Sequence, residues 1–292
     1  MQNVTAIAIA ALGLELIPAV VFACAAQQVA RAAGRWPAAV RIGFPALLVA
    51  PYVMVSVSEH IFRWAWFALY AGLPVVIAWL LLRAAQADVE QRGNWRDWLI
   101  LLVLGLAVDL RWFDRAWPPG LRALNELFLV DAGLYGFLAI RKLSGTGFDF
   151  HLRWSDWKTG VRELIYFTPP VIVLGLALGF IHPHRNLPGI GSALLRWIAI
   201  FFFTAVPEEL FFRAWVQNLL ERRVGRRAAL VIASVLFGLS HFNKRSVHFN
   251  WRYVLLATIA GIFYGRAWRE QRRVLASTIT HASVDWIWGL WF

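Results

Sequence analysis

Long apolar runs are the feature of this sequence that most constrains its fold. A run of about 18 or more apolar residues is long enough to cross a bilayer as a helix, and such runs fill most of the 292 residues. Apolar residues make up 60% of the chain and charged residues only 16%, whereas soluble domains carry nearer a quarter charged residues. We therefore expect an all-α fold, a polytopic transmembrane helical bundle with about 8–10 membrane helices.

Apolar periodicity and turn signals place the individual helices. A pair of glycines at small-xxx-small spacing, Gly261 and Gly265 in "GIFYG", predicts that one of these helices packs closely against a neighbour. The predicted membrane helices are 5–30, 42–58, 64–82, 98–110, 124–140, 161–181, 192–220, 228–243, 252–268 and 274–291.

The formal net charge of +12 does not indicate a nucleic-acid partner. No basic run is interleaved with a polar, soluble module, and basic residues in membrane proteins gather in cytoplasmic loops that meet anionic head groups. Seventeen tryptophans fit an interfacial aromatic belt. The single cysteine, Cys24, excludes an intramolecular disulfide. We expect the lipid bilayer, and no nucleic acid, as a partner.

The stretch "PEELFFR" places ionisable groups in an apolar helix, where they are costly and usually functional. Glu209 and Arg213 are four residues apart with the acid first, the favoured order for an ion pair along one helix face. Glu208 is rotated by about 100° from this face and has no partner at that spacing. Pro207 loosens the helix beside it. Glu208 therefore suits a general base, although a buried charge cluster that only joins helices has equal weight from this stretch alone.

Two further motifs lie at a matching depth. The turn between helices 192–220 and 228–243 is near Val224; Glu208 precedes it by 16 residues and His241 follows it by 17. Two antiparallel helices then hold both side chains at one level. His281 and Asp285, one turn apart in the last helix, share a face at a similar level. A lone histidine in an apolar helix is more often a hydrogen-bonded core group, but four such groups at one level favour a site.

The three motifs resemble those of the CPBP family, which includes type II CAAX prenyl endopeptidases and bacteriocin-processing or Abi-like proteins. The family's EExxxR, FxxxH and HxxxN/D motifs read "EELFFR", "FGLSH" and "HASVD" here, over residues 190–292. The resemblance implies a CAAX-protease-like intramembrane glutamic endopeptidase. It also implies two parts: an N-terminal transmembrane extension, 1–160, and a catalytic transmembrane bundle, 161–292.

The resemblance also assigns roles to the first two motifs. It implies that Glu208 is the base that activates the attacking water and that His241 helps to bind this water. Glu209 and Arg213 would support the site. The implied partner is a membrane-associated protein or peptide substrate, and the implied location is the bacterial inner (cytoplasmic) membrane.

The third motif departs from the pattern. The resemblance implies that His281 and Asp285 occupy the positions that stabilise the tetrahedral oxyanion in the family, where the second position is often Asn. An ionised aspartate has no hydrogen to donate to an oxyanion. We therefore expect Asp285 to orient His281, so that the oxyanion role rests on His281.

Three alternatives remain open at this stage. We expect no cofactor, but Glu208, Glu209, His241 and His281 are ligand types for zinc, so a metal-dependent membrane protease is one alternative, although no HExxH occurs. An ion-coupled transporter also uses intramembrane acids and histidines, but it would more naturally show two repeated halves, which this sequence lacks. A non-catalytic membrane scaffold or immunity protein is the third.

Overall fold

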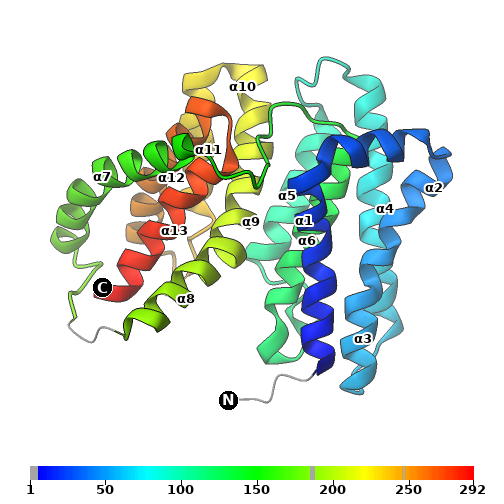
Figure 1. Ribbon diagram of the computed structural model, residues 1–292, viewed down its shortest axis with the longest axis horizontal. Coiled ribbons are helices and arrows are strands. Elements are labelled where there is room, and N and C mark those ends of the chain that lie inside the picture. The colour runs from blue at the N-terminus through cyan, green and yellow to red at the C-terminus, as the bar shows by residue number, and fades with distance from the viewer. Residues whose placement is uncertain (1–5, 185–187, 245, 247) are drawn as a thin grey trace. The chain divides into compact units, whose positions relative to one another are not determined.

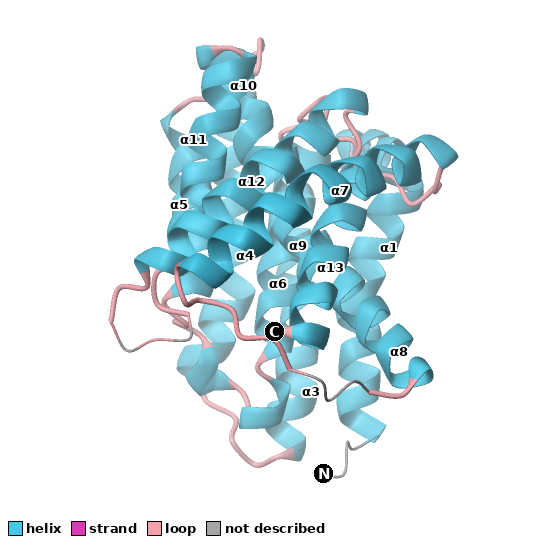
Figure 2. Cartoon of the chain, turned by 90° about the vertical axis from the view of Figure 1, so that its left-hand side faces the viewer, coloured by secondary structure: helices cyan, strands magenta, loops and turns pink. Residues whose placement is uncertain are grey.

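The computed structural model describes residues 6–184, 188–244, 246 and 248–292. The chain is 80% helical, and no strand occurs in the described residues, as Figures 1 and 2 show. The all-α polytopic bundle predicted from the apolar runs is confirmed. Residue 5, the expected start of the first helix, lies outside the described residues.

The chain divides into two compact units, Met1–Ser144 and Gly145–Phe292. This division lies before the predicted boundary at 160/161. The predicted boundary rested on the position of the three motifs, which all lie after residue 160. The assignment of an N-terminal extension and a catalytic bundle stays a prediction.

The first unit contains six α-helices among its described residues. A 3₁₀ segment, Phe44–Val49, joins the second to the third, and a π-helical segment, Tyr135–Ile140, continues the sixth. The helices are α1 (Ala6–Arg35), α2 (Ala38–Gly43), α3 (Ala50–Ser58), α4 (Trp64–Ala87), α5 (Trp95–Asp109) and α6 (Ala123–Leu134).

Several buried polar groups inside this unit pair with one another. The rings of Tyr52 and Tyr70 stack with centroids 5.0 Å apart, and the Tyr70 hydroxyl donates to Asn125 Oδ1 at 3.0 Å. Arg141 donates from Nε to Asp97 at 2.9 Å and from Nη2 to Asp88 at 2.6 Å. Buried polar groups are costly without such partners, so these contacts hold α3, α4, α5 and α6 in register.

The second unit contains the three motifs. Its longest helical run, Ile190–Val224, is interrupted by two π-helical segments, Phe201–Ala205 and Leu210–Gln217. The α-helices of this unit, running from green to red in Figure 1, are α7 (Trp154–Ala177), α8 (Ile190–Ile200), α9 (Val206–Glu209), α10 (Asn218–Val224), α11 (Arg226–Leu239), α12 (Trp251–Gln271) and α13 (Val274–Trp291).

Six helical runs among the described residues are long and apolar enough to cross a membrane. Helices α11 and α13 are not among them, and residues 274–282 of α13 are all buried. Helix α11 ends at Leu239, inside "FGLSH", so His241 lies in the turn after it and not in a helix that runs to 243 as predicted. The chain is an integral membrane protein. The six runs are Ala6–Arg35, Ala38–Ser58, Trp64–Ala87, Pro119–Ile140, Trp154–Ala177 and Ile190–Val224.

Close packing fixes α13 and α12 within the second unit. The Thr280 hydroxyl of α13 donates to the carbonyl of Gly160 in α7 at 3.0 Å, and a side chain at Gly160 would collide with Ile279. Gly261 of α12 lies directly against the backbone of Ser234 in α11. The close approach predicted from "GIFYG" is therefore confirmed, and it aligns the helices that carry the motifs.

Candidate functional site

Irregular helix geometry surrounds the two adjacent glutamates. The short α9 that contains Glu208 and Glu209 lies between the two π-helical segments. Pro207 lacks a backbone N–H and cannot make the regular helical bond, and π-helical turns occur often at functional sites. The irregularity predicted around Pro207 is thus present, directly beside both glutamates.

Glu209 and Arg213 form the predicted ion pair. Arg213 Nε donates to Glu209 Oε2 at 2.9 Å, and both side chains are 0% exposed. The Nη1 and Nη2 atoms of Arg213 have no hydrogen-bond partner among the described residues. The guanidinium instead lies over the ring of Phe237, 5.1 Å from its centroid, a favourable cation–π contact.

His281 lies between three carboxylates. Its Nδ1 is 2.9 Å from Glu209 Oε1, and because an ionised carboxylate only accepts, Nδ1 carries the hydrogen of this bond. Its Nε2 is 3.5 Å from Asp285 Oδ2 and 3.8 Å from Glu208 Oε2. The expectation that Glu208, His281 and Asp285 lie at one level is confirmed. The contact between Glu209 and His281 was not predicted, because the sequence spacing assigned Glu209 to Arg213 alone.

Glu208 has a cationic neighbour that the sequence analysis missed. Lys244 Nζ is 3.8 Å from Glu208 Oε1, so Glu208 has a cationic neighbour outside its own helix, although it has none at the spacing considered from the sequence. Lys244 follows the end of α11. Residue spacing along the helix of Glu208 cannot predict a contact with a residue of another segment. The Glu208 side chain is 24% exposed, whereas Glu209 is fully buried, so Glu208 is the glutamate that the protein does not enclose completely.

His241 presents one ring nitrogen as an acceptor. Its Nδ1 is 2.9 Å from the Phe237 carbonyl oxygen, which accepts and therefore fixes the hydrogen on Nδ1. In the neutral ring, Nε2 then has a free lone pair that can accept a hydrogen bond from water. The ring also packs against Tyr253, with centroids 4.8 Å apart.

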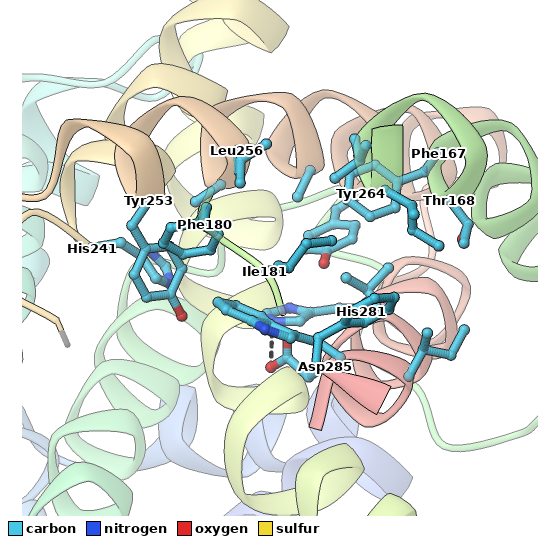
Figure 3. Close-up of a pocket in the computed structure, with 18 of the residues that line it drawn as sticks. Phe167, Thr168, Phe180, Ile181, His241, Tyr253, Leu256, Tyr264, His281 and Asp285 are labelled. Carbon is cyan, nitrogen blue, oxygen red and sulfur yellow. Dashed lines mark ion pairs between the residues drawn. The ribbon is translucent and has the colours of Figure 1, made fainter. Parts of the chain in front are cut away.

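A largely apolar pocket adjoins these side chains (Figure 3). His241, His281 and Asp285 line it, while Glu208 is not among its lining residues. About 90 Å³ of the pocket is open to the centres of water-sized molecules, which is enough for several waters. The remaining lining comes mainly from Phe167, Val171, Phe180, Leu256, Val284 and Trp288.

Tyr264 is a second residue that the sequence analysis did not single out. Its ring stacks on His281 with centroids 4.5 Å apart and planes at 15°, and it lines the pocket. The residue lies between Gly261 and Gly265, in the stretch interpreted only as a packing motif. The one available signal was a polar aromatic residue on that close-packed helix.

The side chains considered as an alternative set of zinc ligands do not form a metal site in the described residues. In the part of the chain that the structure describes, no group of three His, Cys, Asp or Glu side chains is arranged to hold a metal ion. Glu209 is bonded to both Arg213 and His281. The absence of a cofactor stays a prediction, which metal analysis of the purified protein would test.

One family model matches a part of the second unit. Residues 190–287 match the model described as Type II CAAX prenyl endopeptidase Rce1-like. This segment contains all three motifs, and the resemblance stated from the sequence is confirmed. The match indicates a membrane protease, and thus a hydrolase with a membrane-embedded protein substrate. Comparisons with curated proteins and with solved structures found no match.

Proposed function

We propose, because residues 190–287 match the Rce1-like model, that the protein is an intramembrane endopeptidase that hydrolyses a peptide bond with a glutamate-activated water. The proposed base is Glu208. The proposal places the protein in a bacterial inner membrane, with a membrane-associated protein or peptide as its substrate and no cofactor.

The observation that supports this proposal most is that Glu208 and Asp285 both lie close to His281 Nε2. His281 and Asp285 also line a pocket with room for water. A carboxylate, an imidazole and a water-accessible space are the groups that general-base hydrolysis needs. The two glutamates differ in the way this role requires. Glu209 is buried and bonded, while Glu208 is partly exposed and 3.8 Å from each of two basic groups.

The reaction is a balanced hydrolysis. A water molecule donates one hydrogen bond to His241 Nε2 and gives its other proton to Glu208. At the same time, the water oxygen attacks the substrate carbonyl carbon. The carbonyl oxygen then carries a negative charge, which His281 stabilises, as electrostatic stabilisation of an oxyanion requires. When the intermediate collapses, the C–N bond breaks and Glu208 returns the proton to the leaving amine. The products are a carboxylic acid and an amine.

Asp285 orients His281 in this mechanism. Its Oδ2 lies 3.5 Å from Nε2, and Glu209 holds Nδ1 from the other side. An imidazole held at both nitrogens cannot turn, and a fixed ring keeps its charge aimed at the reacting carbonyl. Lys244 would hold the Glu208 carboxylate at the same level.

Glu208→Gln tests the assignment because glutamine has the same shape but cannot accept the proton. The purified protein in lipid vesicles would be incubated with a prenylated peptide ending in a CAAX sequence and with unprenylated membrane-anchored peptides. Cleavage would be followed by mass spectrometry. We expect kcat to fall by a factor of about 10²–10⁴ while the melting temperature stays at the wild-type value.

Glu90→Gln is the matched control. Glu90 lies in the first unit with a side chain that is 70% exposed, so this variant should cleave like the wild type. Wild-type cleavage by Glu208→Gln would contradict the role of the base. Loss of activity on chelator treatment, with bound metal in the purified protein, would favour the metal-dependent alternative.

A further inference from the structure

The motif residues leave the oxyanion short of hydrogen-bond donors. The Nδ1 hydrogen of His281 is used by Glu209, and Nε2 faces the carboxylates of Asp285 and Glu208. An ionised Asp285 has no hydrogen to give. A developing oxyanion normally needs preorganised donors at about 3 Å, so another group near His281 should contribute.

Tyr264 is the group that the structure places there. Its side chain is 1% exposed, and its ring stacks on the imidazole of His281. In Figure 3 its hydroxyl points into the pocket on the side of His281. No hydrogen bond of this hydroxyl is found among the described residues. A buried tyrosine hydroxyl usually has a partner, and here the partner would be supplied by the substrate.

We propose that the Tyr264 hydroxyl donates a hydrogen bond to the oxyanion of the tetrahedral intermediate. This inference rests on the proposed function and adds a catalytic residue to it. The donor forms no covalent bond and keeps its proton throughout, so the balance of the hydrolysis is unchanged.

The surroundings hold this hydroxyl in place before the substrate arrives. The ring is packed between His281, at 4.5 Å, and Phe237, at 5.7 Å, and the Arg213 guanidinium lies 5.9 Å from its centroid. Gly261 and Gly265 on the same helix bring α12 against α11. A donor fixed in this way costs no reorganisation at the moment of reaction.

Tyr264→Phe removes only the oxygen and keeps the stack on His281. Because the hydrogen bond forms with the oxyanion and not with the substrate carbonyl in the ground state, we expect kcat to fall by a factor of about 10² with KM unchanged. The melting temperature should stay at the wild-type value. Kinetics on the peptide that the wild type cleaves would provide both constants. Tyr166→Phe is the control, because Tyr166 is 55% exposed on α7 and outside the pocket.

A second substitution separates catalysis from packing. Asp285→Asn adds an amide donor beside His281, so the double variant Tyr264→Phe/Asp285→Asn should recover at least about tenfold in kcat over Tyr264→Phe alone. A merely structural role of the hydroxyl predicts no such recovery.

The outcomes distinguish this inference from the proposed function. If Glu208→Gln is inactive but Tyr264→Phe keeps the wild-type kcat, the role of Tyr264 is overturned and the protease assignment stands. The role would also be overturned if Tyr264→Phe lowered the melting temperature together with kcat and the double variant did not recover kcat. If Glu208→Gln cleaves like the wild type, both proposals fail.

Discussion

Two buried arginine sites in the second unit differ in how completely their donors are used. Arg273, directly before α13, donates from Nε to Asp156 Oδ1 at 2.7 Å and from Nη1 to Asp149 Oδ2 at 3.0 Å. Its Nη2 donates to the His151 carbonyl at 2.6 Å. Within the described residues, Arg213 donates only from Nε, to Glu209, and its guanidinium lies over the ring of Phe237.

This difference separates a structural site from a reactive one. A saturated cluster has one low-energy arrangement and fixes the chain, as the Arg273 cluster fixes the loop before α7 and the start of α13. An arginine bonded at a single nitrogen leaves the second oxygen of its carboxylate for another group, here His281. The Glu209 carboxylate, which is held by Arg213, thus helps to fix the position of the proposed catalytic imidazole. Substitutions at each site should therefore change different properties.

The largest effect on stability is expected for Arg273→Gln. It leaves the fully buried Asp156 carboxylate without its cation, and removal of one partner of a buried ion pair costs about 3–5 kcal/mol. The free energy of unfolding in detergent would measure this loss. Arg252→Gln, an exposed change at the other end of α12, should have almost no effect. Equal stability of the two variants would contradict the structural role of the Arg273 cluster.

Glu209→Gln should lower both stability and activity. The amide keeps the shape of the side chain but leaves Arg213 without a buried counter-charge and weakens the bond to His281. We expect a loss of about 3 kcal/mol in the free energy of unfolding, at the low end for a buried ion pair because the amide oxygen still accepts from Arg213, together with reduced cleavage. Folded yield and kcat would be measured side by side with Glu208→Gln, which should lose activity alone. Normal yield of Glu209→Gln would argue against the pairing.

The smallest effect is expected at Asp149, at the edge of the saturated cluster. Partial burial opposes its ionisation, but hydrogen bonds from the His151 backbone N–H and from Arg273 lower the pKa of Asp149 from 3.8 to about 2. A carboxylate with a lowered folded-state pKa stabilises the protein above its unfolded pKa, and this contribution is lost as the pH falls toward the folded-state pKa.

Asp149→Asn should therefore cost about 1 kcal/mol at neutral pH, and the difference from the wild type should disappear between pH 4 and about 2. Thermal unfolding of both proteins across this range would measure the difference. A difference that stays constant down to pH 2 would show that Asp149 does not act through its charge.

Sequence spacing was sufficient for contacts within one helix. The apolar runs predicted the helices, because a bilayer requires long apolar segments whatever their neighbours are. The ion pair of Glu209 with Arg213 followed from residues four apart on one helix face. Motif order was sufficient for the family resemblance, and the match of residues 190–287 to the Rce1-like model supports it.

Only the tertiary structure decided which side chains meet across helices. The contacts of His281 with Glu209, of Lys244 with Glu208 and of Tyr264 with His281 join different helices or loops. Their geometry depends on how each helix is rotated and on the irregular turns around Pro207. A rise of 1.5 Å per residue fixes depth along a helix, but rotation and approach are set by packing, at places such as Gly160 and Gly261. For this reason the sequence placed the proposed catalytic groups at one level, and the fold alone determined their partners.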